Sequence, residues 1–291
     1  MTMVPTLSVC IRSYNQESYI GKAIESALLQ RTNFDFEVII SDDNSSDKTK
    51  EIISVYQANY PNRIRCIFGD CNIGGPLNLK RSIEASSAKY LAFLDGDDYY
   101  TDKYKLQKQV DFLESHNDYS ACFHNVVDLY EKSGRKSLFL PLDFPEDHDC
   151  VSVISNDWFL PIHSVVLRRE LITFPRWYET VMNDDFVVNL SVVMHGPYHY
   201  MPDIMAVYRH HDCNVSNNYV NQILIDSQLK TILLGFKDIY PKEYAPVFDE
   251  RISFYEKRIK FNVREKKQPW RKIFRLKTYK RIIKRWLMRL N

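Results

Sequence analysis

The sequence has no glycine-rich loop of the kind that cradles phosphate. Neither G-x-G-x-x-G after the first predicted strand nor G-x-x-x-x-G-K-[ST] occurs in the 291 residues, and only 8 of them are glycine. These absences exclude the dinucleotide fingerprint and the P-loop. A phosphate group bound by this chain would therefore need a metal ion in place of a glycine cradle.

Paired cysteines and long apolar runs are also absent. The six cysteines, at 10, 66, 71, 122, 150 and 213, include no C-x-x-C pair and no zinc-finger spacing, which favours free thiols in a reducing compartment. No window reaches 18 uninterrupted apolar residues, and MTMVPTLSVC at the N-terminus lacks the charged start and apolar run of a signal peptide. We therefore expect a cytoplasmic protein.

The small net charge of +2 conceals two oppositely charged parts. Residues 264–291 contain 12 Lys or Arg against one acidic residue, a balance of +11, which leaves −9 for the rest of the chain. A basic tail on an acidic body indicates two surfaces with different roles.

Strand-like and helix-like segments alternate through most of the chain. Strands are predicted at 7–14, 36–43, 64–69, 89–95, 119–130, 164–169 and 198–211, and helices at 19–30, 47–60, 78–87, 104–115 and 184–196. Residues 131–157 are rich in turn formers and acids, and we expect them to be irregular. The alternation predicts an α/β fold with a mostly parallel, Rossmann-like central sheet flanked by helices. Beyond residue 217 the pattern is helical, which predicts a helical C-terminal extension.

The stretch YLAFLDGDDYYTD (90–102) places three carboxylates directly after a buried strand. Asp95, Asp97 and Asp98 repel one another and raise one another's pKa unless a cation or hydrogen-bond donors satisfy them. Mn²⁺ and Mg²⁺ prefer oxygen ligands, and Mg²⁺ is usually held by one or two carboxylates together with water and substrate phosphates. The D-x-D spacing therefore indicates a divalent metal bound with a nucleotide phosphate, while a simple turn at Asp95 and Gly96 is the structural alternative.

Two further polar clusters follow predicted strands. They are Arg12 to Asn15 after the first strand and Asp42 to Asp47 after the second. Ligands of open α/β sheets bind beyond the carboxyl ends of the strands, so we expect all three clusters to meet at one edge. For the second cluster, capping of the next helix by Ser45, Ser46 or Asp47 is the alternative.

Three stretches, in this order, resemble the nucleotide-sugar domain of family 2 glycosyltransferases, which have the GT-A fold. They are SVCIRSYNQESYIGKAIESALLQ, FEVIISDDNSSDKT and CNIGGPLNLKRSIEASSAKYLAFLDGDDYYTDKYKLQKQVDFLE. The resemblance is dense over residues 7–130 and thinner to 216. It implies a GT-A domain at 1–216, with a nucleotide-sugar half at 1–130 and an acceptor and catalytic half at 131–216, followed by the extension at 217–291.

The resemblance also implies roles for individual residues. It assigns the nucleotide sugar to Arg12, Tyr14, Asn15, Asp42, Asp43, Asn72, Gly74, Asn78, Arg81, Asp95 and Arg209, and the metal to Asp97 with Asp95 and His211. Tyr14 would stack on the base, and Asp42 or Asp43 would bind the base or the ribose. Asn78, Lys80 or Arg81 would lie near the diphosphate. For His211 a structural role is an equal alternative.

Asn183-Asp184-Asp185-Phe186 stands where the family carries an acidic pair at a helix start. The second acid of that pair usually serves as the base, which points to Asp185, with Asp184 beside it. A carboxylate within hydrogen-bond reach accepts the proton of an acceptor hydroxyl while the new bond to the anomeric carbon forms. One base, one metal and no covalent step imply inversion at that carbon. A helix N-cap is the structural alternative, and for Trp158 and His163 we favour packing over acceptor binding.

The basic tail has the pattern of an amphipathic helix. In QPWRKIFRLKTYKRIIKRWLMRLN the apolar residues recur at spacings of three and four, with Lys and Arg between them. Such a helix lies on an anionic membrane surface, although packing on the protein's own body and nonspecific attraction to nucleic acid are alternatives. No specific nucleic-acid motif is present.

Together these features predict an inverting glycosyltransferase that depends on Mn²⁺ or Mg²⁺. The expected donor is a nucleoside diphosphate sugar, with a UDP-sugar that carries a hexose or N-acetylhexosamine favoured. The expected acceptor is a hydroxyl of a glycan or lipid-linked saccharide in bacterial-type surface polysaccharide synthesis, at the inner face of the cell membrane. The rival hypotheses are a nucleotidyltransferase, which would normally have a glycine-rich and basic loop after the first strand, and a noncatalytic nucleotide-sugar or glycan-binding relative.

Overall fold

Ten strands in the described part of the chain form one sheet in the order β3-β2-β1-β4-β9-β6-β10-β5, with β7 beside β6 and β8 beside β10. The structure is a computed structural model and describes residues 4–156, 159–212 and 222–267. The strands are β1 (Leu7–Ser13), β2 (Phe36–Asp42), β3 (Ile64–Phe68), β4 (Tyr90–Asp95), β5 (Tyr99–Tyr100), β6 (Ala121–Tyr130), β7 (Arg135–Leu138), β8 (Asp147–His148), β9 (Val166–Arg168) and β10 (Tyr198–His210). The α-helices are α1 (Ile20–Leu28), α2 (Thr49–Asn59), α3 (Gly75–Ala85), α4 (Lys105–Ser115), α5 (Cys150–Ser155), α6 (Asp184–Val193), α7 (Gln222–Lys237) and α8 (Ala245–Lys267).

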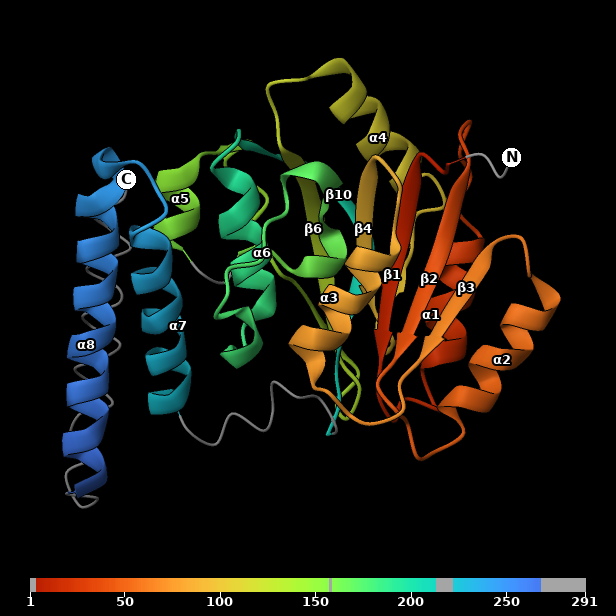
Figure 1. The fold of residues 1–291 in the computed structure, drawn as a ribbon, viewed down its shortest axis with the longest axis horizontal. Coiled ribbons are helices and arrows are strands. Elements are labelled where there is room, and N and C mark those ends of the chain that lie inside the picture. Colours follow the sequence, from red (N-terminus) through yellow and green to blue (C-terminus); the bar gives the residue numbers. More distant parts are fainter. Residues whose placement is uncertain (1–3, 157–158, 213–221, 268–291) are drawn as a thin grey trace. The chain divides into compact units, whose positions relative to one another are not determined.

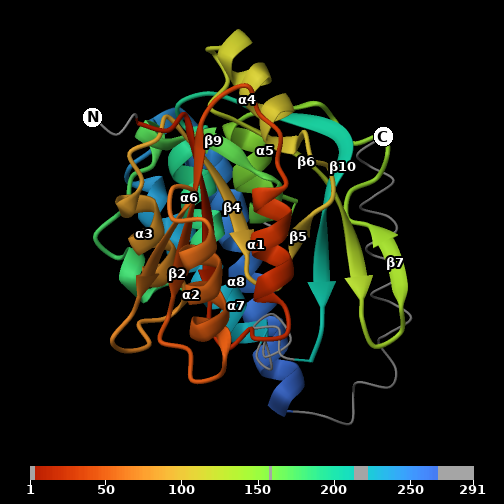
Figure 2. The ribbon, with the colours of Figure 1, turned by 90° about the vertical axis from the view of Figure 1, so that its right-hand side faces the viewer.

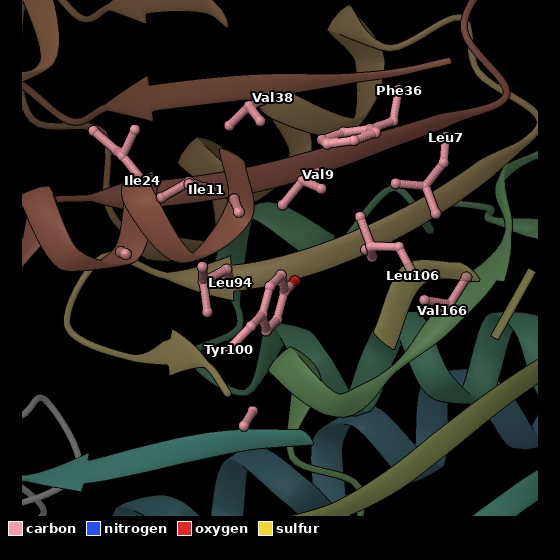
Figure 3. Packing of buried hydrophobic residues seen from close by; sticks show 14 of the residues in the cluster. Leu7, Val9, Ile11, Ile24, Phe36, Val38, Leu94, Tyr100, Leu106 and Val166 are labelled. Atoms are coloured by element: carbon pink, nitrogen blue, oxygen red, sulfur yellow. The ribbon is translucent and has the colours of Figure 1, made fainter. Parts of the chain in front are cut away.

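The first four strands in this order run parallel, which fits their apolar sequences. β1 pairs with β2 and β4, and β2 pairs with β3, all in parallel register. Strands of a parallel sheet are covered on both faces and therefore read as nearly continuous apolar runs. Leu7, Val9 and Ile11 of β1 are fully buried, and Figure 3 shows them beside Phe36 and Val38 of β2. Because burying one such side chain stabilises the fold by about 1.5–3 kcal/mol, β1 is a central part of the core.

Helices cover both faces of this parallel half (Figures 1 and 2). α1 and α3 lie on opposite faces of β1, and α6 packs beside α3. The apolar residues Ile20, Ala23, Ile24 and Ala27 recur with a helical period along α1, and all four are buried. The arrangement confirms the predicted α/β architecture.

The other half of the sheet is mixed. β6 and β10 are parallel to each other, whereas β9 is antiparallel to both β4 and β6, and β5 and β8 are antiparallel to β10. Residues 131–157, which we expected to be irregular, contain β7, β8 and α5. Asp149 begins α5 by accepting a hydrogen bond from the Ser152 amide at 2.9 Å. Short elements of this kind give too brief a periodic pattern for the sequence to indicate.

α3 begins at Gly75 and not at Asn78, where the sequence pattern placed its start. Gly74 precedes it with φ of +89°, in the left-handed region that glycine adopts without strain. Pro76 occupies the first turn, where its missing N–H would have had no helical partner. This Gly-Gly-Pro start directs α3 away from the edge of the sheet where β1, β2 and β4 end.

Contacts divide the chain into two compact units, residues 1–214 and 215–291. In the second unit α7 and α8 pack together, and Asp226 of α7 is fully buried. The Arg258 guanidinium of α8 donates two hydrogen bonds to this carboxylate, one of them from Nε at 2.7 Å. Breaking a buried pair of this type costs about 3–5 kcal/mol, so the Asp226–Arg258 pair stabilises the packing of α7 against α8.

In the part of the chain that the structure describes, no helix has the length and apolar character needed to cross a membrane. Among the described residues, Cys10, Cys66, Cys71 and Cys122 are free thiols. Trp158 and most of the basic tail, residues 268–291, lie outside the described residues, so the amphipathic helix stays a prediction.

Candidate active site

The carboxyl ends of β1, β2 and β4 bring the polar clusters of the sequence together. Arg12 is in register with Asp95 of β4, and Ser13 is in register with Asp42 of β2. The edge beyond such strand ends is where open α/β sheets bind ligands. The predicted meeting of these clusters is therefore confirmed.

Arg12 joins the D-x-D turn to the start of α6. Its Nε and Nη2 donate to the two carboxylate oxygens of Asp95, the second at 3.4 Å, and its Nη1 donates to Asp184 Oδ2 at 2.5 Å. Although burial alone would raise it, the Arg12 guanidinium holds the pKa of Asp95 below its ordinary value. The Arg12 guanidinium thus lies between two carboxylates of the candidate catalytic centre, and its predicted contact with the nucleotide sugar stays a prediction.

Asp97 and His211 meet from distant parts of the chain. His211 Nε2 lies 3.0 Å from Asp97 Oδ2, and the two side chains are only 6% and 13% exposed. The Tyr19 ring stacks on His211 with the ring centroids 4.5 Å apart. Asp95, which was also predicted to bind the metal, forms an ion pair with Arg12, and its metal role stays a prediction.

Asp98 and His163 form a buried pair behind this turn. His163 Nδ1 lies 3.3 Å from Asp98 Oδ2, and both side chains are at most 2% exposed. Burial and the charges of Asp97 and Asp95 raise the pKa of Asp98 well above its ordinary value, and burial lowers the pKa of His163 to about 4. Asp98 Oδ2 has no hydrogen-bond donor among the described residues. His163 is therefore a core residue, as we favoured from the sequence.

Asp97 and His211 fit a metal ion that binds together with a diphosphate. Among the residues described, no three or more His, Cys, Asp or Glu side chains are grouped so as to hold a metal ion. A carboxylate oxygen and an imidazole nitrogen are both available ligands, and phosphate oxygens and water would supply the remaining positions.

Asp42 braces the loop that follows β2. Its carboxylate accepts hydrogen bonds from the Ser45 amide at 2.9 Å, the Ser45 hydroxyl at 2.5 Å and the Ser13 hydroxyl at 3.1 Å. The side chain is fully buried. In the structure Asp42 thus fixes the loop after β2, and its predicted contact with a base or ribose stays a prediction.

Asp43 holds the loop Asn72-Ile73-Gly74 against the same edge of the sheet. Its two carboxylate oxygens accept hydrogen bonds from the backbone amides of Ile73 and Gly74, each at 2.9 Å. Asn72 Oδ1 also accepts from the Gly74 amide, at 3.2 Å. These contacts hold Asn72 and Gly74 beside the end of β2, and their predicted contact with the nucleotide sugar stays a prediction.

The turn after β1 presents Tyr14 to solvent. Asn15 adopts a left-handed conformation with φ of +52°, and its Oδ1 accepts the Ser46 amide at 2.8 Å. The Asn15 amide in turn donates to the Ser45 hydroxyl at 2.9 Å. The Tyr14 side chain is 48% exposed and is therefore accessible for stacking.

Asn78 and Arg81 of α3 attach to the end of β2. Arg81 Nε donates to the Ser41 hydroxyl at 2.9 Å, and its Nη2 donates to the Asp42 carbonyl at 2.8 Å and to Asn78 Oδ1 at 2.7 Å. Asn78 is only 2% exposed. Both side chains pack against the end of β2. Their contact with a diphosphate stays a prediction.

Asp184 and Asp185 begin α6, as the sequence predicted. Burial raises the pKa of Asp184, against the opposing charge of Arg12. Burial and the negative charge of Asp184 raise the pKa of Asp185 to about 6, again opposed by Arg12. A carboxylate with a pKa near 6 is suited to accept a proton close to neutral pH.

Arg209 lies among aromatic rings beside the same turn. Its guanidinium carbon is 4.7 Å from the Tyr99 ring centroid and 5.1 Å from that of Tyr19. Its backbone amide donates to Asp98 Oδ1 at 2.8 Å, which ties β10 to the D-x-D turn two residues before His211.

Sequence reasoning missed Tyr19 and Glu131. The Tyr19 hydroxyl donates to Glu131 Oε2 at 2.9 Å, and Glu131 Oε1 lies 3.6 Å from Arg209 Nε. Both residues hold the surroundings of His211 in place. Neither carries a local motif, because their role depends on contacts between distant segments.

A family model decides the classification of this chain. The model described as glycosyl transferase family 2 matches residues 8–157, a range that contains β2 to β4, all of β1 except Leu7, the D-x-D turn and α4. The chain belongs to glycosyl transferase family 2.

Proteins of similar sequence agree with membership in family 2. An uncharacterized protein of Mycobacterium tuberculosis is 39% identical over 205 residues, which cover 70% of this chain and 59% of that protein. This chain thus matches less than two thirds of the mycobacterial protein's length. An uncharacterized glycosyltransferase of Nostoc is 29% identical over 72% of this chain and 66% of its own length. The putative teichuronic acid biosynthesis glycosyltransferase TuaG of Bacillus subtilis is 35% identical over 38% of this chain and 42% of its own.

Solved structures identify the fold of this family 2 member as GT-A. S. aureus TarS 1-349 in complex with UDP-GlcNAc superposes with a TM-score of 0.66 and 18% identity, covering 86% of this chain and 71% of that one. The mannosyltransferase PcManGT of Pyrobaculum calidifontis, in complex with GDP-Man and Mn²⁺, gives a TM-score of 0.61 and 17% identity over 86% and 70% of the two chains. At this level of identity the likeness concerns the fold.

Proposed function

We propose that this protein is an inverting, metal-dependent glycosyltransferase that uses a nucleoside diphosphate sugar. The observation that carries the proposal is the Asp97–His211 pair, with 3.0 Å between Oδ2 and Nε2. The pair lies at the sheet edge where Arg12 contacts Asp184 at the start of α6. Family membership supports glycosyl transfer. It also argues against a nucleotidyltransferase.

Asp185 acts as the base in this proposal. Its carboxylate accepts the proton of the acceptor hydroxyl while that oxygen attacks the anomeric carbon, and the bond from this carbon to the diphosphate breaks. Asp184 stays bound to Arg12 and does not compete for the proton. Since Asp185 is the only proton acceptor invoked and no covalent sugar intermediate forms, the anomeric configuration inverts.

Asp97 and His211 would hold the metal ion through Oδ2 and Nε2. When bound, the metal supplies positive charge that stabilises the departing nucleoside diphosphate. An imidazole ligand favours Mn²⁺ over Mg²⁺, because Mg²⁺ is bound in proteins mainly through oxygen atoms. Arg209 lies close enough to the D-x-D turn to add a second positive charge near the diphosphate.

The donor pocket lies between Tyr14, Asp43 and the loop that ends at Gly74. A base would stack on the exposed Tyr14 ring. UDP is the favoured nucleotide, and a hexose or N-acetylhexosamine the favoured sugar, a choice supported by the UDP-GlcNAc held by the structurally similar TarS. The TuaG likeness supports an acceptor hydroxyl on a surface polysaccharide or its lipid-linked precursor, and the basic tail supports a place at the cytoplasmic face of the membrane.

The proposal is tested by incubating the protein with Mn²⁺ and a panel of UDP-, GDP- and TDP-sugars. Release of nucleoside diphosphate identifies the donor, and NMR of the product gives its anomeric configuration. We expect turnover of one donor class with inversion. Donor binding in calorimetry without turnover on any acceptor would instead favour a noncatalytic nucleotide-sugar-binding protein, and retention would contradict the assigned mechanism.

A further inference from the structure

One partly buried arginine contacts one acid of each acidic pair in the candidate active site. Arg12 is 83 positions from Asp95 and 172 positions from Asp184 in the sequence. It projects from the end of β1, whereas Asp95 ends β4 and Asp184 begins α6. The contacts therefore join three separate elements through one side chain.

All three guanidinium nitrogens take part. Nε and Nη2 face the two oxygens of Asp95, and Nη1 faces Asp184. The Arg12 side chain is 22% exposed and that of Asp184 only 6%. A planar fork with fixed donor directions fixes the relative position of the two carboxylates, which the single ammonium of lysine does not do.

We propose that Arg12 is a positioning residue. It fixes the start of α6, which carries the proposed base Asp185, relative to the turn after β4, which carries the proposed metal ligand Asp97. The role rests on the function proposed above. Asp185 follows Asp184 directly at the start of α6, and Asp97 follows Asp95 by two residues in the turn. A clamp between Asp95 and Asp184 therefore fixes the distance between the proton acceptor and the diphosphate side of the site.

The clamp also explains why α6 begins with two acids. An unpaired carboxylate buried at the position of Asp184 would be costly. With Arg12 in place, Asp184 is neutralised through a charge-assisted hydrogen bond, and Asp185 is left without an ion pair among the described residues. One acid of the pair thus anchors the helix and the other remains available for chemistry.

Two variants separate this role from simple charge compensation. Arg12→Lys keeps the positive charge without the fork, and Arg12→Met removes both. A displacement of about 1 Å at a reacting centre costs about 10²-fold in rate, so we expect kcat to fall by about that factor in both variants, with the donor KM unchanged. Arg65→Met is the matched control, because Arg65 pairs with Glu37 at 3.3 Å on the outer strands and its side chain is 47% exposed.

Three outcomes of these kinetics would overturn the proposal. Wild-type kcat in Arg12→Lys would mean that charge alone is needed. A raised donor KM with unchanged kcat in both variants would place Arg12 at the nucleotide, and an equal loss of kcat in Arg65→Met would mean a nonspecific effect.

A stability measurement tests the clamp even if no donor is turned over. Urea midpoints are compared for wild type, Arg12→Met, Asp184→Ala and the double variant. Because residues in one ion-pair network are not additive, we expect the double variant to lose no more stability than Arg12→Met alone. Additive losses would overturn the clamp, whereas absence of turnover with the expected coupling would refute the proposed function and leave the clamp standing.

Discussion

His211 Nε2 lies 3.0 Å from Asp97 Oδ2 although 114 positions separate the two residues in the sequence. The contact joins the segment after the last strand of the sheet to the turn after β4. It is supported on one side by Tyr19, whose ring stacks on the imidazole, and on the other by Asp98, which accepts the amide hydrogen of Arg209. The fold thus holds Asp97 Oδ2 and His211 Nε2 together, and these are the two atoms that we propose as metal ligands.

Asp97→Asn should abolish stabilisation by metal and nucleotide together. Binding only to the folded state raises its stability, so Mn²⁺ with UDP should raise the melting temperature of the wild type and not that of Asp97→Asn. The control is Asp128→Asn, because Asp128 contacts the neighbouring His210 at 2.8 Å in a pair of the same chemistry. A shift retained by Asp97→Asn, measured by differential scanning fluorimetry, would remove Asp97 from the metal site.

Asp185→Asn should lower kcat by about 10²–10⁴-fold, the usual contribution of a general base, without weakening donor binding. Since only the carboxylate accepts a proton and burial raises the pKa of Asp185 to about 6, wild-type kcat should rise with pH through about 6 and then level off. Rate profiles between pH 5 and 8 provide the check. A profile that is flat over this range, or an Asn variant as active as wild type, would exclude Asp185 as the base.

Several parts of this site could be predicted from the sequence, and others depended on tertiary contacts. The apolar runs that become β1, β2 and β4 indicate strands, and the acids that follow them necessarily meet at one edge. The contact of Arg12 with Asp184 could not be inferred in this way, because it depends on where α6 packs. The pairing of Asp97 with His211 followed from family resemblance and not from local periodicity.

The helices and strands also divide into those that the sequence predicts and those that depend on tertiary contacts. The start of α3 was misplaced because the sequence reading gave no weight to Pro76, which is favourable in a first helical turn. β7, β8 and α5 were missed because each is too short to show a periodic pattern of its own. Instead, β7 pairs with β6, β8 pairs with β10, and α5 packs on α6. In contrast, α1 carries a long apolar stripe and was predicted with nearly its observed bounds.

Lys105→Met should remove a pH dependence of stability. Lys105 is fully buried, its Nζ donates to Gln109 Oε1 at 2.8 Å, and burial lowers its pKa from 10.5 to about 7. Between these two pH values the unfolded chain binds the proton more tightly than the folded chain, so this group makes stability rise with pH. The melting temperature of the wild type minus that of Lys105→Met should therefore be smallest near pH 6.5 and should increase up to pH 9.5. A constant difference across this range would show that Lys105 titrates normally.

Removal of the basic tail should reduce binding to anionic vesicles. A chain ending at residue 263 lacks 12 basic side chains, each of which contributes about 1 kcal/mol of attraction near an anionic surface. Flotation with phosphatidylglycerol vesicles should recover the full chain and not the truncated one, and phosphatidylcholine vesicles serve as the control. Equal and negligible flotation of both chains would exclude the membrane proposal.

Metal-dependent turnover of the donor tests the central proposal most directly. With the nucleotide sugar identified from the panel, nucleoside diphosphate release is measured for wild type, Asp97→Asn and Asp128→Asn, each with Mn²⁺ and with EDTA. We predict turnover by wild type and Asp128→Asn that needs Mn²⁺, and none by Asp97→Asn. Full Mn²⁺-dependent turnover by Asp97→Asn, or wild-type turnover that is unchanged by EDTA, would contradict the proposed function.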